Sequence, residues 1–191
     1  MSANFIKTDF PGLVVIQPKI FRDERGYFLE VFSEIEFSKA EIREHFVQDN
    51  QSHSIKGVLR GLHYQTDPMA QGKLIRCIKG EIYDVAVDLR IGSPTYLKHF
   101  CITLSETNQT QVYIPSGFAH GFCTLSDTAT IVYKVTKPYS PKHEKGIIWN
   151  DPKLNIEWPI SSPILSEKDS RLPLIDQTEH RFEYSQQLIA V

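Results

Sequence analysis

The sequence has little of what marks secreted, membrane or metal-binding proteins. It contains only three cysteines, Cys77, Cys101 and Cys123, which form no CxxC pair and each lie within an apolar run. Disulfide frameworks and structural zinc sites use paired cysteines, so we interpret these as buried free thiols in a reducing compartment. No apolar run approaches the roughly 18 residues of a membrane span, and the first residues have no signal-peptide core. We therefore expect a cytoplasmic protein without membrane attachment.

An excess of charge of one sign is also absent. The formal net charge is -2 for 191 residues, which gives no overall attraction to nucleic acid or to anionic lipid. Any phosphate site must then be built locally. The chain has no repeat, low-complexity segment or linker, and its length suits one sizeable core. We expect a single domain over 1–191, with its core at about 10–173 and a polar tail after it.

Helical periodicity is nearly absent as well. A capping box of Ser33 and Glu36 predicts a helix from 33 to about 45, and residues 165–169 suit one helical turn. Elsewhere, short apolar or alternating runs are separated by glycine and proline turns about every 8–12 residues. The predicted strands include 13–16, 57–65, 73–78, 82–90, 100–104, 111–114 and 129–136. This pattern predicts an all-β sandwich or barrel with one or two short helices.

The strand at 57–65 carries an arginine and a histidine among apolar residues. Strict alternation places Arg60 on one face of this strand and His63 on the other. Gly61 lies between them and lets a ligand approach the backbone. We interpret the strand as an active-site strand, with His63 as a base and Arg60 as an anion holder. The alternative is a core strand whose histidine is satisfied by hydrogen bonds.

Polar residues also interrupt the N-terminal aromatic and strand segments. Glu30 alternates with aromatic residues, and a half-buried carboxylate needs a partner. Arg25 lies in the charged turn before Glu30. Three interpretations of Arg25 stay open: it pairs with Glu30, it contacts a ligand, or it is solvated. Gln48 and Asn50 would share one strand face and suit a polar ligand such as a base or a sugar, unless they lie in a plain loop.

Four further residues stand where a strand delivers a polar group. Lys73 follows a glycine at a strand start and suits a cation near a substrate oxyanion, although a surface lysine gives the same pattern. Asp84 lies on a strand that otherwise looks buried, so it is a candidate for orienting another group. A PxGxxH turn delivers His120 to a strand, and Tyr133 lies among β-branched neighbours.

The sequence offers too few candidate ligands for a metal ion. Small β-barrels with a PxGxxH turn often hold a metal through several histidines and a carboxylate, but here only His63 and His120 qualify. We therefore expect no metal site, which disfavours a metal-dependent oxygenase. Two histidines, a lysine, an arginine, tyrosines and acids remain. This set suits proton transfer at a carbon acid, with cations holding an oxyanion or a phosphate.

Several long motifs occur together and in order: 57–65, 71–73, 84–90, 92–94, 114–122, 133–134 and 149–152. With them the sequence resembles the dTDP-4-dehydrorhamnose 3,5-epimerase family over about residues 10–173. The resemblance implies a cupin-type jelly roll without metal or other cofactor. It also implies a homodimer in which N-terminal residues contribute to the neighbouring site. The substrate would be dTDP-4-dehydro-6-deoxy-D-glucose and the product dTDP-4-dehydro-L-rhamnose, on the route to dTDP-L-rhamnose for cell-surface polysaccharide.

The resemblance also implies roles for individual residues. His63 matches the proton acceptor, Asp169 the carboxylate paired with it, Tyr133 the proton donor, and Lys73 the lysine near the C4 oxygen. Tyr139 matches the aromatic that stacks on thymine. The residues that match contacts to the substrate or its nucleotide are Arg25, Glu30, Gln48, Asn50, Arg60, His120, Glu144 and Lys168.

Two other functions stay open at this point. A single-centre 3- or 5-epimerase, or a ketoisomerase, on a related dTDP-sugar would share the barrel and the base. A non-catalytic barrel that only binds a nucleotide sugar would keep the shape of the site but not His63 or Tyr133, and both are present.

Overall fold

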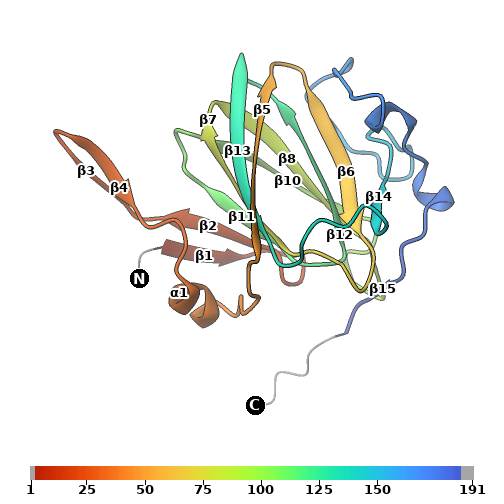
Figure 1. Cartoon of the computed structure of the whole chain (residues 1–191), viewed down its shortest axis with the longest axis horizontal. Coiled ribbons are helices and arrows are strands. Elements are labelled where there is room, and N and C mark those ends of the chain that lie inside the picture. The colour runs from red at the N-terminus through yellow and green to blue at the C-terminus, as the bar shows by residue number, and fades with distance from the viewer. Residues whose placement is uncertain (1–2, 186–191) are drawn as a thin grey trace.

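The computed structural model describes residues 3–185, which form two antiparallel sheets that face each other (Figure 1). The first sheet has the order β1 (Ala3–Lys7), β2 (Val14–Pro18), β11 (Gln111–Ile114), β7 (Lys73–Lys79), β13 (Thr128–Val135) and β5 (Gln48–Ile55). The second has the order β10 (His99–Ser105), β8 (Glu81–Asp88), β12 (Phe118–Thr124), β6 (Leu59–Gln65) and β14 (Glu144–Gly146). The all-β prediction is confirmed, although within the described residues the two sheets are not hydrogen-bonded into a closed barrel.

The remaining elements are short. Two small ladders are the antiparallel hairpin of β3 (Ile20–Asp23) and β4 (Gly26–Leu29), and the parallel pair of β9 (Arg90–Ile91) and β15 (Phe182–Glu183). The helices are α1 (Glu34–Lys39) and two 3-10 turns, Asp169–Arg171 and Ile175–Gln177. No helix in residues 3–185 is long and apolar enough to cross a membrane.

The main core lies between the sheets. Its buried members include Ile75 of β7, Ile82 and Ala86 of β8, Phe122 of β12 and Ile131 of β13. They come from strands of both sheets, and along each strand they alternate with residues of the other face, as a half-buried strand requires. Burial of this apolar surface holds the two sheets together and leaves room for a site only where polar residues replace core residues.

The predicted helix at 33–45 is much shorter in the structure. Helix α1 ends at Lys39, and the capping serine makes no side-chain cap hydrogen bond. The chain then turns, because Glu41 has φ = 68° and the amide of Ile42 donates to the carbonyl of Phe37 at 3.0 Å. Ile42 and Phe37 are buried in one cluster. The apolar spacing that suggested a longer helix is therefore satisfied by folding the chain back onto the first sheet.

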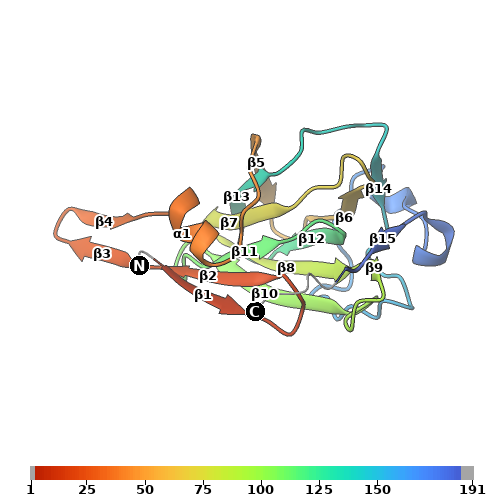
Figure 2. The same ribbon diagram turned by 90° about the horizontal axis from the view of Figure 1, so that it is seen from below.

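The β3–β4 hairpin projects away from both sheets (Figures 1 and 2). Three of its aromatic side chains, Phe21, Tyr27 and Phe28, are about half or more exposed. Arg25 pairs with Asp23 at the tip of the hairpin. Glu30 is also exposed, so the expectation that it is half-buried is wrong for the chain taken alone.

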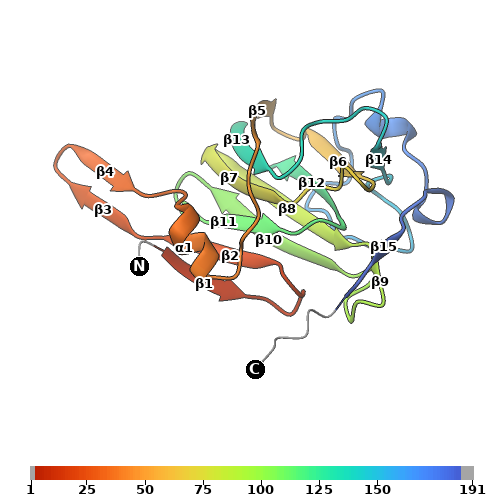
Figure 3. The same cartoon turned by 60° about the horizontal axis from the view of Figure 1, so that its bottom comes forward.

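The segment after Pro173 is packed rather than loose up to residue 185. Ile175 and Phe182 are buried in a cluster on the outer face of the second sheet. The hydroxyl of Tyr64 on β6 donates to the carbonyl of Glu179 at 2.8 Å. Figure 3 shows this C-terminal segment, in blue, passing beside β9. The core therefore extends beyond the predicted limit at 173.

Candidate active site

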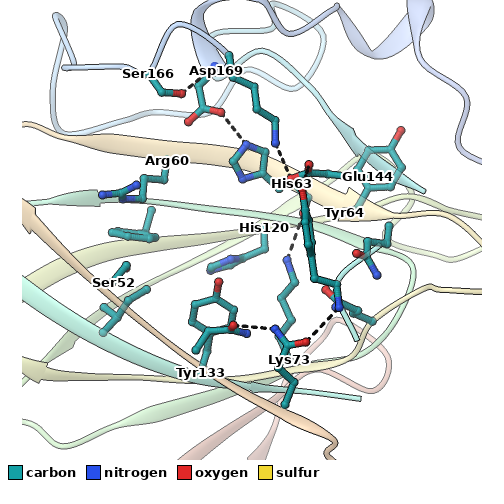
Figure 4. A pocket seen from close by; sticks show the side chains of 18 residues that line it. Ser52, Arg60, His63, Tyr64, Lys73, His120, Tyr133, Glu144, Ser166 and Asp169 are labelled. Atoms are coloured by element: carbon teal, nitrogen blue, oxygen red, sulfur yellow. Dashed lines mark hydrogen bonds and ion pairs between the residues drawn. The ribbon is translucent and has the colours of Figure 1, made fainter. Parts of the chain in front are cut away.

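Polar side chains replace core residues at one end of the space between the sheets and line a cavity of about 500 Å³ (Figure 4). Pockets for small ligands fall within about 300–1,000 Å³. The lining residues are Gln48, Asn50, Ser52, Arg60, His63, Tyr64, Gln65, Gln71, Lys73, His120, Phe122, Ile131, Tyr133, Tyr139, Glu144, Ser166, Lys168 and Asp169. All the predicted site residues are among them except Arg25 and Glu30.

An irregularity in β6 brings Arg60 and His63 into the same cavity. His63 is paired with His120 of β12, whereas Arg60 is paired with Phe122, so three steps along β6 oppose two along β12. This extra residue is a β-bulge, and it shifts the phase of the alternation by one. The prediction that Arg60 and His63 lie on opposite faces is therefore wrong, because strict alternation does not hold across Gly61.

Gly61 itself is required by the neighbouring strand. It has φ = 115°, and a Cβ there would lie 2.6 Å from the Cα of Gly121 and 2.7 Å from the carbonyl oxygen of His120. Non-glycine residues rarely adopt such a φ, and real Cβ atoms do not approach backbone so closely. The two glycines let β6 and β12 approach each other at the bulge, which sets the spacing of the two histidines.

His63 and Asp169 form the first histidine–carboxylate pair of the site. The His63 Nε2 lies 2.7 Å from Asp169 Oδ1, and the carboxylate side chain is 5% exposed against 29% for the imidazole. Burial alone would raise the pKa of Asp169, but the hydrogen bond and charge of His63 lower it below its usual value. The Ser166 hydroxyl accepts a hydrogen bond from the Asp169 amide at 3.0 Å. The carboxylate is thus held ionised beside the imidazole.

His120 and Asp84 form a second such pair. The His120 Nε2 lies 2.8 Å from Asp84 Oδ2, and both side chains are at least nine-tenths buried. His120 lines the cavity, whereas Asp84 lies behind it on β8. Asp84 thus has a partner in the cavity, the imidazole of His120.

Lys73 lies on the wall of the cavity that faces the two histidines, since β7 belongs to the first sheet and β6 and β12 to the second. It is 8% exposed. Its ammonium donates to the carbonyl of His63 at 3.3 Å, across the cavity (Figure 4). Burial lowers the pKa of Lys73 to about 8, while the charges of Asp84 and Glu144 oppose that fall. A buried ammonium with so few partners is placed to meet negative charge on a ligand.

Tyr133 lies on the same wall as Lys73. It is paired with Ile75 of β7 on one side and with Asn50 of β5 on the other. Burial raises the pKa of Tyr133, and Arg60 acts in the opposite direction. The phenol therefore stays protonated at neutral pH and is able to donate.

A chain of hydrogen bonds builds the mouth of the cavity around Tyr139. The Tyr139 hydroxyl donates to Glu144 Oε2 at 2.8 Å, and Lys168 pairs with the same carboxylate at 2.5 Å. Burial would raise the pKa of Glu144, but these two contacts lower it. Gln48 accepts from the Tyr139 amide at 3.1 Å and donates to Asn50 at 2.8 Å. Gln48 and Asn50 are thus in a strand, not a plain loop.

Arg60 lies at the other end of the cavity. Its Nε donates to the hydroxyl of Ser54 at 3.1 Å, and one terminal nitrogen donates to the carbonyl of His53 at 3.3 Å. Both partners are neutral, so the guanidinium charge is not matched by either of them. An exposed arginine held in this way suits a phosphate or another anion.

Comparison with known proteins identifies the family. A model of the family described as dTDP-4-dehydrorhamnose 3,5-epimerase matches residues 7–177. The dTDP-4-dehydrorhamnose 3,5-epimerase of Shigella flexneri is 55% identical over 167 residues, which cover 87% of this chain and 92% of the relative. The chain belongs to the dTDP-4-dehydrorhamnose 3,5-epimerase family.

The solved structures of the epimerase family agree in fold. A crystal structure of dTDP-6-deoxy-D-glucose-3,5-epimerase from Legionella pneumophila, in complex with dTDP-4-keto-L-rhamnose, has a TM-score of 0.92 and 44% identity. The likeness covers 96% of this chain and 99% of that one. A single-centre relative is more distant: the dTDP-4-dehydrorhamnose 3-epimerase of Streptomyces niveus is 40% identical over 83% of this chain and 77% of its own length.

Several epimerase cavity residues were not predicted from the sequence. Ser52 continues the alternation of Gln48 and Asn50 along β5; its Oγ is buried and has no hydrogen-bond partner within the described chain. Phe122 and Ile131 are each two residues from a predicted site residue on the same strand, and this spacing was the available signal. The other lining residues not predicted are Tyr64, Gln65, Gln71 and Ser166.

Proposed function

We propose that this epimerase family member converts dTDP-4-dehydro-6-deoxy-D-glucose into dTDP-4-dehydro-L-rhamnose, inverting C3 and C5 in dTDP-L-rhamnose biosynthesis. One observation carries the proposal. His63, backed by Asp169, lies on one wall of the cavity, while Tyr133 and Lys73 lie on the facing wall. A base and an acid on opposite walls are what inversion at carbon requires.

Proton removal is assigned to His63. C3 and C5 flank the C4 ketone, so each of their protons is acidic through an enolate. Neutral His63 accepts the proton, and the ionised Asp169 fixes its tautomer and stabilises the imidazolium that forms. The low pKa of Asp169 keeps it a carboxylate, so it does not itself take the proton away from His63.

Stabilisation of the enolate is assigned to Lys73. Negative charge grows on the C4 oxygen only as the proton leaves, so a preset ammonium lowers the barrier more than it aids binding of the ketone. Burial strengthens this interaction because little water competes for the charge. Tyr133 then returns a proton to the opposite face of the enolate, which inverts the centre. The reaction needs no redox cofactor, because the C4 ketone already makes both C–H bonds acidic and proton transfer alone inverts each centre.

The nucleotide is assigned to the mouth of the cavity. Tyr139 is 55% exposed and offers its ring to a base, while Lys168 beside it offers charge to the diphosphate. Arg60, at the other end of the cavity, offers a second cation to the ligand. Gln48 and Asn50 offer amide groups to the sugar or the base. The unpaired hydroxyl of Ser52 suits a sugar hydroxyl in the same cavity.

The homodimer belongs to the proposal as well. Arg25 and Glu30 lie on or beside the projecting β3–β4 hairpin and do not line the cavity of their own chain. If they contact the substrate as the family pattern implies, they reach the site of a second subunit. The exposed aromatic residues of the hairpin suit such an intersubunit contact.

Proton NMR of dTDP-4-dehydro-6-deoxy-D-glucose in D2O, with purified protein treated with EDTA, tests the proposal. Deuterium at both C3 and C5, with formation of the L-rhamno product, is the expected result. Label at a single centre would instead support a mono-epimerase like the relative from Streptomyces niveus. Binding without any label would contradict catalysis and favour a binding barrel.

A further inference from the structure

A buried carboxylate lies behind the cavity and has no role in the reaction described so far. The core-facing side chains of β8 run Ile82, Asp84, Ala86, and the two neighbours of Asp84 are both members of the core between the sheets. Asp84 is 1% exposed. Placing an ionised carboxylate in an apolar core is costly unless it is paired, so its presence calls for a partner that needs it.

Two groups of the cavity depend on this carboxylate. His120 hydrogen-bonds to Asp84 through Nε2 at 2.8 Å. Burial lowers the pKa of Lys73, and the negative charge of Asp84 acts in the opposite direction. His120, Lys73 and Asp84 interrupt the apolar inner faces of three different strands, β12, β7 and β8. The polar floor of the cavity is therefore one charge-balanced unit in which a single carboxylate serves two cationic or potentially cationic groups.

We propose that Asp84 is a positioning residue that fixes the His120 ring and balances the charge of Lys73, so that both groups are presented to the same oxygen of the substrate. The carboxylate of Asp84 accepts from Nε2–H of His120, so the ring meets the substrate through Nδ1. In the imidazolium form, which a carboxylate stabilises, Nδ1–H donates to the substrate oxygen. This inference rests on the proposed function, since the oxygen in question is the one that becomes the enolate oxygen.

The surroundings of Lys73 set the direction of the expected effect. The titratable groups around it come from every neighbouring strand of the cavity: Asp84, His120, His63, Tyr133 and Glu144. Only Asp84 and Glu144 among these raise the pKa of Lys73, which lies at about 8. Removing the Asp84 charge then lowers the pKa of Lys73 further. If that pKa falls by about one pH unit, the protonated fraction of Lys73 at pH 8 falls about fivefold.

The test compares Asp84→Asn with the wild-type enzyme over pH 6 to 9 on the 4-keto sugar nucleotide. We expect the alkaline limb of the kcat profile to move toward lower pH, and kcat at pH 8 to fall about fivefold or more, with little change in KM. Asp84→Glu should restore part of kcat. Asp127→Asn, an exposed aspartate outside the cavity, removes the same charge and serves as the control.

A double-mutant cycle with His120→Gln separates orientation from folding. If Asp84 acts through His120, the effect of Asp84→Asn on kcat is smaller in the His120→Gln background than in the wild type. An unchanged pH profile and unchanged kcat in Asp84→Asn would overturn the inference. So would a change confined to thermal stability. Absence of turnover in the wild-type enzyme would instead refute the proposed function.

A titration of the wild-type protein decides the matter if Asp84→Asn does not fold. The ε-carbon of Lys73, assigned by comparison with Lys73→Arg, should titrate in a 13C NMR spectrum with a midpoint near the pKa of about 8. A midpoint near the ordinary lysine value of about 10.5 would show that Lys73 is not the desolvated ammonium on which the inference rests, and would overturn it.

Discussion

The two histidine–carboxylate pairs of the cavity lie side by side but differ in construction. His63 and His120 are opposite each other on neighbouring strands, and each bonds a carboxylate through Nε2 at nearly the same distance. The carboxylate of the first pair, Asp169, comes from a short 3-10 turn 106 residues further along the chain. That of the second, Asp84, is built into a central strand.

This difference suits one pair to proton transfer and the other to holding negative charge on the substrate. The imidazole of His63 is 29% exposed and that of His120 is 10%. A base must meet the substrate proton and release it again, which suits the accessible ring. A group that only holds an oxyanion gains from rigidity and burial, because a preset charge needs no reorganisation during the reaction. We therefore propose that the first pair moves protons and that the second, together with Lys73, holds charge.

The largest expected effect comes from breaking the first pair. Asp169→Asn preserves the shape of the side chain but leaves His63 without a carboxylate to fix its tautomer and to stabilise the imidazolium. We expect kcat to fall about 10³- to 10⁴-fold, as for the aspartate of a catalytic triad. Steady-state kinetics at pH 7.5 measures this, with circular dichroism to check folding. A fall below tenfold would mean that the two pairs share the base role.

The pH dependence of stability gives a second contrast. The pKa of Asp169 in the folded protein is below its usual value, so its pair contributes stability above the unfolded-state pKa of about 4, and this is lost as pH falls through the folded-state pKa. Urea unfolding at pH 7 and at pH 3.5 should show a smaller loss for Asp169→Asn than for the wild type. An equal loss would contradict the ion pair.

Forcing the two strands apart should disturb the spacing of the pairs. Gly61→Ala adds a Cβ against the backbone of Gly121 at a positive φ, and we expect it to cost about 3 kcal/mol or more of unfolding free energy. Gly92→Ala is the matched control, since Gly92 also has a positive φ but nothing within 4 Å of the added atom. It should cost about 1 kcal/mol. Equal losses in a denaturant titration would show that only backbone strain matters at Gly61.

Removing the proton donor Tyr133 is expected to slow the reaction less than breaking the His63–Asp169 pair. Tyr133→Phe keeps the ring but has no proton to return, so the inverted product should form about 10²-fold more slowly. Exchange of substrate protons with D2O should continue, because both histidine pairs are intact. NMR that follows label and product in the same sample separates the two rates, and unchanged epimerisation would refute the donor role.

The smallest effect is expected at the contact between strand β6, which carries His63, and the C-terminal segment. The Tyr64 hydroxyl ties β6 to the C-terminal segment through the Glu179 carbonyl, so Tyr64→Phe should cost about 1 kcal/mol of stability. The change should reduce kcat by less than Asp169→Asn does. Thermal unfolding followed by circular dichroism, alongside steady-state kinetics, measures both. No loss of stability would show that the C-terminal segment holds itself in place without this contact.

The strands could be predicted well from the sequence because alternation and turn residues are local signals. The site residues came from the motifs of the family, and those on the walls of the cavity do converge. Prediction failed where distant contacts decide: the bulge at Gly61 depends on Gly121, and the short helix α1 depends on the packing of Ile42 against Phe37. The exposure of Glu30 could not be predicted either, because its surroundings depend on where the hairpin points.

The most direct test of the division of labour is deuterium exchange in matched histidine variants. His63→Ala and His120→Ala are each mixed with dTDP-4-dehydro-6-deoxy-D-glucose in D2O, and label at C3 and C5 is followed by NMR. We predict no exchange with His63→Ala at either centre, and slowed exchange at both with His120→Ala. Exchange that persists with His63→Ala and disappears with His120→Ala would reverse the assignment of the two pairs and contradict the account.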